Sequence, residues 1–246
     1  MVYSRYLIFV LILCSQTVFG QNDEKKNSLG LSFNPNYLYR TIWATGPEHK
    51  SIVDNASDND FGFIGFSIGI KYSRQISHKI NIESGLLISQ RGVGSILHTD
   101  LVFDSIGDPK GNLRKLQTRV VRHYIDFPLL FQYRFVDKEK VSYYLKTGIS
   151  FNLLINRTTY YTRYFESGFY ESGEHFIGFN DRKHYNFKTV HVTYILSLGF
   201  EYKFRESLSF VIEPIVMYSI LPVDKSDWMD YRFLEMGLTL GIYYHF

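Results

Sequence analysis

The stretch Phe233 to Phe246, FLEMGLTLGIYYHF, alternates between two kinds of side chain. Apolar side chains occupy every second position from Leu234 onward, and small or polar residues fill the positions between them. Successive side chains of a β-strand point to opposite faces, so this stretch predicts a strand with one apolar and one polar face. Its final residue, Phe246, is aromatic.

The same two-residue period recurs in seven further runs along the chain. Each run exceeds the roughly 9–11 residues that a tilted strand needs to cross a bilayer. An apolar outer face that alternates with a polar inner face is typical of transmembrane β-barrels. The runs are Leu29 to Arg40, Phe61 to Arg74, Lys79 to Gly92, His123 to Phe135, Val141 to Asn156, His191 to Phe204 and Leu208 to Ile220.

The connections between these runs alternate between short and long. The short ones are 75–78, 136–140 and 205–207, and the long ones are 41–60, 93–122, 157–190 and 221–232. Outer-membrane barrels have an even number of strands, short periplasmic turns and long extracellular loops. The sequence therefore predicts an all-β, eight-stranded antiparallel transmembrane β-barrel in the bacterial outer membrane, with long extracellular loops and both termini periplasmic. The aromatic Phe246 resembles the end that barrel-assembly machinery recognises, and we expect it to act as an assembly signal.

Two of the long connections carry further strand signals. Asp108-Pro109-Lys110-Gly111 is a turn sequence between two alternating stretches, so we expect the third and fourth strands to continue as a hairpin above the membrane. The segment from Tyr160 to Phe179 predicts a second such hairpin. A ten-stranded barrel would place one of these hairpins in lipid, and their charged residues argue against that.

The N-terminal residues predict a secretory signal peptide. Arg5 precedes the apolar core Leu7 to Leu13, and Val18-Phe19-Gly20 fits a cleavage site. This core is far shorter than the roughly 20 apolar residues of a membrane anchor. Lipidation at Cys14 is disfavoured because the bulky Leu13 precedes it. We expect residues 1–20 to be the signal peptide, 21–28 a short periplasmic segment and 29–246 the barrel domain.

Charge and cysteine content limit the possible functions. The formal net charge is only +3 and the basic residues are scattered, which gives no indication of a nucleic-acid partner. The single cysteine would leave with the signal peptide, so we expect neither disulfide nor thiol chemistry in the mature chain. We expect no cofactor and no metal, and the expected surroundings are outer-membrane lipid.

The predicted inner face carries five acidic and five basic residues. Eight strands enclose an interior that side chains just fill, and an unpaired charge there would cost several kcal/mol. We therefore expect a salt-bridged, closed lumen rather than a selective channel. The residues of this lumen charge network are Lys71, Glu83, Arg91, Asp126, Arg134, Lys146, Glu201, Lys203, Glu213 and Glu235.

Two prolines interrupt the strand pattern. Pro128 and Pro214 lie inside predicted strands, where each lacks the N–H group that a ladder hydrogen bond needs. We expect a β-bulge at each of these positions.

The segment Tyr124-Ile125-Asp126-Phe127-Pro128-Leu129-Leu130 resembles the Tyr-Ile-Glu/Asp-x-Pro-Leu-Leu signature of the PorT-like outer-membrane β-barrel family. Gly85-Leu86 followed by Arg91-Gly92 is similar to the segment that precedes this signature. The resemblance spans about Leu29 to Phe246 and implies an outer-membrane barrel. It also implies an alternative function as a component of a protein-secretion or transport complex, although no residue here indicates that role.

We also considered an enzyme that modifies lipids. His98 and His123 are predicted near the outer rim of neighbouring strands. No serine beside them points to the same face, so the sequence offers no nucleophile paired with a base. The sequence therefore favours a non-enzymatic, porin-like barrel with no catalytic residues, whose long loops contact the exterior or a partner protein.

Overall fold

The structure is a computed structural model that describes residues 26–98, 113–165, 168, 170–177, 189–225 and 229–246. The predicted signal peptide, most of the segment 21–28 and the turn at 108–111 lie outside the described residues. The strands of the described part are β1 (Asn27–Ala44), β2 (Asp60–Ser77), β3 (Ile80–His98), β4 (Leu113–Asp137), β5 (Val141–Phe165), β6 (Tyr170–Ile177), β7 (Val190–Arg205), β8 (Leu208–Ser219), β9 (Asp224–Lys225) and β10 (Met229–His245).

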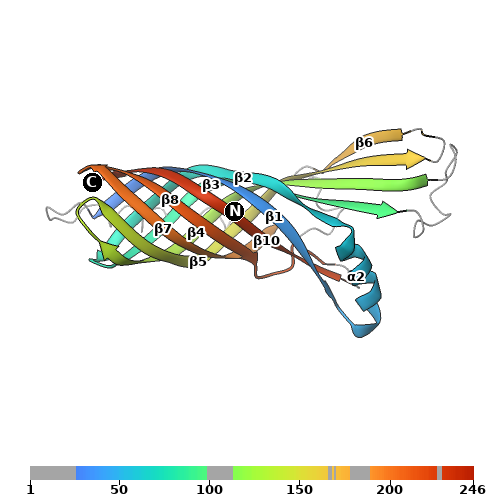
Figure 1. The fold of residues 1–246 in the computed structure, drawn as a ribbon, viewed down its shortest axis with the longest axis horizontal. Coiled ribbons are helices and arrows are strands. Elements are labelled where there is room, and N and C mark those ends of the chain that lie inside the picture. Colours follow the sequence, from blue (N-terminus) through green and yellow to red (C-terminus); the bar gives the residue numbers. More distant parts are fainter. Residues whose placement is uncertain (1–25, 99–112, 166–167, 169, 178–188, 226–228) are drawn as a thin grey trace, which may run out of the picture.

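Eight of these strands close into a barrel (Figure 1). Antiparallel pairing runs in the order β1, β2, β3, β4, β5, β7, β8 and β10, and β10 pairs back onto β1. The seam extends to Phe246, because Asn27 N donates to Phe246 O at 3.0 Å and Phe246 N donates to Asn27 O at 2.9 Å. The predicted eight-stranded antiparallel barrel is confirmed.

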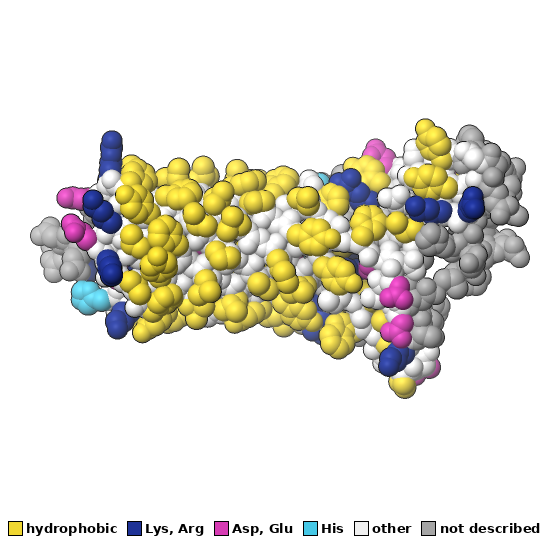
Figure 2. Space-filling model, in the orientation of Figure 1, with side chains coloured by type: hydrophobic (Ala, Val, Ile, Leu, Met, Phe, Trp, Pro, Cys, Tyr) yellow, Lys and Arg dark blue, Asp and Glu magenta, His cyan; other side chains and the backbone are white. Residues whose placement is uncertain are grey.

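The two faces of the wall differ as the alternation predicts. On β1, Leu31 is 60% exposed, whereas the adjacent Ser32 is 1% exposed. The same contrast recurs around the ring, and Figure 2 shows hydrophobic side chains covering the barrel wall, with Lys and Arg side chains beyond both ends of this band. Apolar side chains therefore form the outer surface, and small or polar side chains form the interior.

Beyond one end of the wall, β3, β4 and β5 continue as a sheet that includes β6 (Figure 1). Among the described residues β6 pairs with β5 alone and lies off the ring, so the hairpin predicted from Tyr160 onward is present and a ten-stranded barrel is excluded. His98 pairs with Lys115, which extends the β3–β4 hairpin as expected.

The connection between β1 and β2 contains a short 3-10 helix (Pro47–His49) and the helix α2 (Lys50–Asp58), neither of which was predicted. No helix in the described ranges is long and apolar enough to cross a membrane.

The expectation of β-bulges at the two prolines is wrong. The β3–β4 register is unchanged across Pro128, and the β7–β8 register is unchanged across Pro214. Each proline interrupts pairing with one neighbouring strand only, because it still pairs with Ser150 or Leu238 on its other side. The missing N–H group thus removes a local ladder contact without shifting the strand.

A charge placed in the apolar band tests this arrangement. Ile68→Arg, near the middle of β2, should lower the free energy of unfolding in lipid vesicles by about 2–4 kcal/mol, because the guanidinium would lie in hydrocarbon. The matched variant Ile76→Arg, close to the short turn, should cost about 1 kcal/mol or less. Reversible urea titration measures both, and equal costs at the two sites would contradict the assigned band.

Candidate functional site

The ten charged residues predicted for the lumen all lie on the inner face of the wall, and they come from seven of the eight barrel strands. Nine are buried, and Lys203 is at the short-turn rim with its side chain 28% exposed. They form three layers of ion pairs along the barrel, here named the lower, central and upper layers from the short-turn end.

The central layer is a square of alternating charges. Lys146 Nζ lies 2.9 Å from Glu83 Oε2 and also contacts Glu213 Oε1. Lys71 Nζ lies 3.4 Å from Glu83 Oε1 and 3.6 Å from Glu213 Oε2. Each lysine thus faces both glutamates, so the two positive and two negative charges neutralise one another without bulk water.

Two tyrosines complete the central layer. Tyr144 donates its hydroxyl to Glu213 Oε1 at 2.5 Å, and Tyr243 donates to Glu83 Oε2 at 3.4 Å. The Tyr144 ring lies directly across Gly199, where any side chain would collide with it. The glycine therefore allows a large aromatic ring to lie flat on the inner wall and to reach the charge square.

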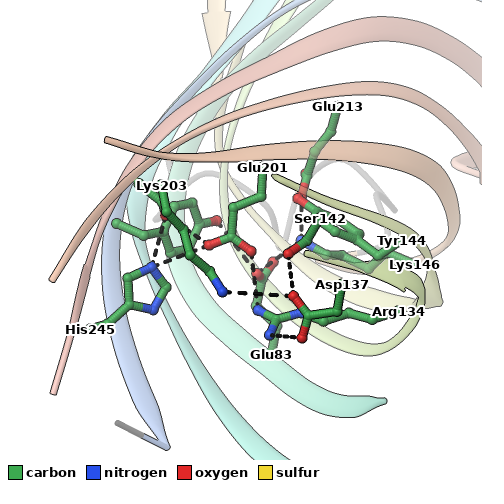
Figure 3. Close-up of polar contacts among 12 residues, drawn as sticks. Glu83, Arg134, Asp137, Ser142, Tyr144, Lys146, Glu201, Lys203, Glu213 and His245 are labelled. Atoms are coloured by element: carbon green, nitrogen blue, oxygen red, sulfur yellow. Dashed lines mark hydrogen bonds and ion pairs between the residues drawn. The ribbon is translucent and has the colours of Figure 1, made fainter. Parts of the chain in front are cut away.

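The lower layer surrounds Glu201 (Figure 3). Arg134 Nη2 donates to Glu201 Oε2 at 3.1 Å, and Ser209 Oγ donates to Glu201 Oε1 at 2.8 Å. His245 Nε2 lies 3.2 Å from the same Oε1 atom. Asp137 joins the layer through Arg134 at 3.8 Å and through Lys203 at 3.7 Å.

The upper layer is built on Arg91. Its two terminal nitrogens donate to the two carboxylate oxygens of Asp126 at 3.1 and 3.0 Å, and its Nε lies 2.8 Å from Glu235 Oε1. Asn152 Nδ2 donates to Asp126 Oδ1 at 2.7 Å, and Asn36 Nδ2 donates to Glu235 Oε2 at 3.3 Å. Bidentate and amide hydrogen bonds of this kind offset the cost of burying the charges.

An apolar constriction separates the upper and central layers. Leu130, Ile195, Ile215 and Met217 pack together on the inner face. They line a cavity of about 30 Å³ that also touches Lys71 of the central layer and Arg91 of the upper layer. A volume of this size holds about one water molecule.

The mouth at the short-turn end is wider and polar. A cavity of about 160 Å³ is lined there by Ser73, Asn81, Arg134, Lys203 and His245, among others. It ends at the lower layer, so it is a vestibule rather than a passage through the barrel.

Sequence reasoning missed several inner residues. Asp137 has the parity of an outward position, but the β4–β5 register shifts between Arg134 and Val136 and turns it inward. His245 and Tyr243 already lay on the polar face of the terminal stretch, and Tyr144 had inward parity. The inward parity of His245, Tyr243 and Tyr144 would have identified them as hydrogen-bonding partners of the lumen charges. Nothing in the sequence indicates the register shift that turns Asp137 inward.

The segment resembling the PorT-like signature follows the same alternation. Its inward residues are Tyr124, Asp126 and Leu130, while Ile125, Phe127 and Leu129 face outward. Pro128 lines the small cavity between the layers. The segment therefore contributes both to the upper layer and to the apolar constriction.

The two histidines considered for catalysis are not brought together. His123 pairs with Gln90 in the β3–β4 ladder, whereas His98 pairs with Lys115. His123 instead contacts Asn156 Oδ1 at 2.6 Å through Nδ1 and Gln90 Oε1 at 3.3 Å through Nε2. Within the described residues, no group of three or more His, Cys, Asp and Glu side chains is arranged to hold a metal ion.

A closed eight-stranded ring with an apolar outer band and an ion-paired interior is the architecture of small outer-membrane proteins. The family model described as outer membrane protein beta-barrel domain matches residues 19–225. The chain belongs to this family. The protein is therefore an outer-membrane barrel of bacteria, and no curated protein matches it in sequence.

Solved structures similar to this outer-membrane barrel have low sequence identity. Ail, the attachment invasion locus protein of Yersinia pestis, is 13% identical over 91% of this chain and 100% of its own, with a TM-score of 0.37. OprG from Pseudomonas aeruginosa is 12% identical over 91% and 99%, with a TM-score of 0.44. The protease OmpT from Escherichia coli is 10% identical over 94% and 100%, with a TM-score of 0.48. Structural similarity at these identities and TM-scores does not indicate a shared activity.

Removing one charge from the central layer of the barrel should be costly. Lys146→Met leaves Glu83 and Glu213 with Lys71 alone, and we expect a loss of about 3–5 kcal/mol in the free energy of unfolding. Lys203→Met at the hydrated rim should cost about 1 kcal/mol or less. Urea titration in detergent micelles measures both values.

A compensating variant provides the control for this comparison. Lys146→Met combined with Glu83→Gln restores one positive charge to one negative charge and should recover part of the loss. If Lys146→Met were as mild as Lys203→Met, the central square would not hold the barrel together.

Proposed function

We propose that the protein is a non-enzymatic outer-membrane barrel with a closed lumen, whose long-loop end lies outside the cell and contacts the exterior or a partner protein. The observation that carries the proposal is the succession of ion-paired layers inside the wall. Lys146 and Lys71 bridge Glu83 of β3 and Glu213 of β8, and Arg91 bridges Asp126 of β4 and Glu235 of β10. Opening a path would separate these buried opposite charges, which costs several kcal/mol.

The apolar constriction supports the same conclusion. Leu130, Ile195 and Met217 lie between two charged layers, where an ion would lose its hydration shell. The vestibule at the short-turn end reaches the lower layer. Between the lower and central layers the cavity lined by Glu201 and Glu83 measures about 20 Å³, which is too small for a hydrated ion.

The proposed orientation rests on loop length. The short turns and the last residue lie at one end of the barrel, and the β3–β6 sheet and α2 lie at the other (Figure 1). Outer-membrane barrels carry their short turns in the periplasm. Phe246 would then be the aromatic insertion signal. Phe246→Ala, which keeps both backbone bonds to Asn27, separates the role of the ring from strand closure.

A component of a secretion or transport complex, as the PorT-like resemblance implies, is the second candidate. Purification in a mild detergent distinguishes it, because a complex member would emerge with stoichiometric partners. Lipid modification is the third, and an unchanged lipid A profile in a deletion strain would exclude it. The separation of His98 from His123 disfavours that activity.

A closed lumen has an electrical consequence. The purified mature protein in planar bilayers should give no steady conductance, because the ion-paired layers leave no continuous water column. An open porin in the same bilayer serves as the positive control. Regular single-channel steps from the wild-type protein would overturn the closed-lumen proposal.

Cysteine labelling tests the orientation. His175→Cys in β6 and Lys140→Cys in a short turn are both exposed positions. On intact cells a membrane-impermeant maleimide should label His175→Cys alone, and after permeabilisation it should label both. Labelling of Lys140→Cys on intact cells would reverse the orientation.

A further inference from the structure

The sheet that β3, β4, β5 and β6 form beyond the wall continues the lipid-facing side of the barrel, away from the short turns. Ile88 and Phe127 are lipid-facing and are 57% and 46% exposed. Two residues further along β3, Gln90 has the same facing and pairs directly with His123 of β4. Direct cross-strand partners share a face, so the outer face of the sheet is continuous with the apolar band.

A polar row marks where the apolar band ends. Gln90, His123 and Asn156 are neighbours on three strands and are linked side chain to side chain at 3.3 and 2.6 Å. Such a row would be unfavourable in hydrocarbon. It indicates the level at which lipid tails give way to head groups.

Beyond this row, the same face of β4 carries Val121 and then Arg119. The Arg119 guanidinium lies 3.9 Å from the centre of the Phe63 ring, an arrangement that places a cation over an aromatic face. Phe63 lies flat against Gly92, where a Cβ atom would come within 2.6 Å of the ring. The glycine thus holds the ring in place beneath the guanidinium, which is itself exposed.

A second cation occupies the same face of β4 further from the wall. Lys115 Nζ lies 5.4 Å from the centre of the Tyr164 ring. Tyr160, the cross-strand partner of Arg119, is 42% exposed beside it. On this face of β3 to β6, Glu174 is the one carboxylate among the described residues, so the surface is basic and aromatic.

We propose that this face, formed by His123, Arg119, Tyr160, Lys115 and Tyr164, binds the phosphorylated saccharide head group of a lipid in the outer leaflet. Arginine recognises phosphate oxygens through paired N–H donors, and lysine adds a point charge. Exposed tyrosines supply flat surfaces and hydroxyl groups for sugar rings. The occupant is a lipid because the surface begins where the lipid-facing band ends. The inference rests on the proposed orientation, which places this sheet on the outer side.

The opposite face of the same sheet supplies a matched control. Arg163 of β5 points to the inner side, where it lies 3.8 Å from Glu171 and above the Tyr161 ring at 5.2 Å. Replacing Arg163 or Arg119 by Gln removes one positive charge from the same sheet. Only Arg119 lies on the face proposed to contact lipid.

Native mass spectrometry of the full mature barrel in micelles tests the proposal, with lipid A, dephosphorylated lipid A and phosphatidylethanolamine as probes. We expect the wild type to prefer lipid A over both other lipids. Arg119→Gln should weaken lipid A binding about tenfold, which is the loss of one charge-assisted contact. Arg119→Lys should retain part of the affinity, and Arg163→Gln should change it less than about twofold.

Equal binding of all three lipids, or equal losses for Arg119→Gln and Arg163→Gln, would overturn the proposal. Heat-modifiable gel mobility verifies that each variant remains folded. The micelle measurement depends on neither orientation nor lumen closure. A reversed labelling pattern or a measured conductance would therefore refute the proposed function. The lipid-binding result could still be interpreted independently of that outcome.

Discussion

Charges that are enclosed by eight strands must be neutralised by other charges, because beyond the vestibule the lumen has room for very little water. Lys146 shows the consequence most directly, since it is fully enclosed and touches both Glu83 and Glu213. Moving such a group from water into the interior costs several kcal/mol unless well-oriented ion pairs and hydrogen bonds offset the lost hydration. Strands β3 and β8, which are not neighbours of β5 in the ring, are therefore tied to β5 through this one ammonium group.

The backbone provides the space that this pairing requires. Tyr144 and Tyr243 reach the central carboxylates because they lie across glycines of neighbouring strands, Gly199 and Gly30 respectively. A larger residue at either glycine would push the ring toward the barrel axis. The glycines and the large polar side chains of the inner face are therefore packed against one another. The space that a glycine leaves on one strand is filled by a side chain from the neighbouring strand.

The degree to which the sequence predicts this molecule varies with the physical origin of each feature. The alternation at Leu31 and Ser32, repeated in eight runs, determines the wall and its two faces because the side-chain period of a strand is fixed. Inward charges such as Glu83 follow from the same period. Asp137 does not, because a register shift depends on how β4 meets β5. The partners within each layer also depend on the three-dimensional shear of the barrel, which no single strand encodes.

The seam between β1 and β10 joins the first described strand of the barrel to the last. Asn27 and Phe246 exchange two backbone hydrogen bonds across more than two hundred residues of intervening chain. Contacts of such sequence separation carry a large loop-closure entropy and are typical of slow folding. Each of the seven other strand pairings joins barrel strands that are consecutive along the chain, but the ring itself can close only when β1 and β10 meet. Until then β1 and β10 both present open edges, so the period between synthesis and closure is when this chain is most exposed to mispairing with another.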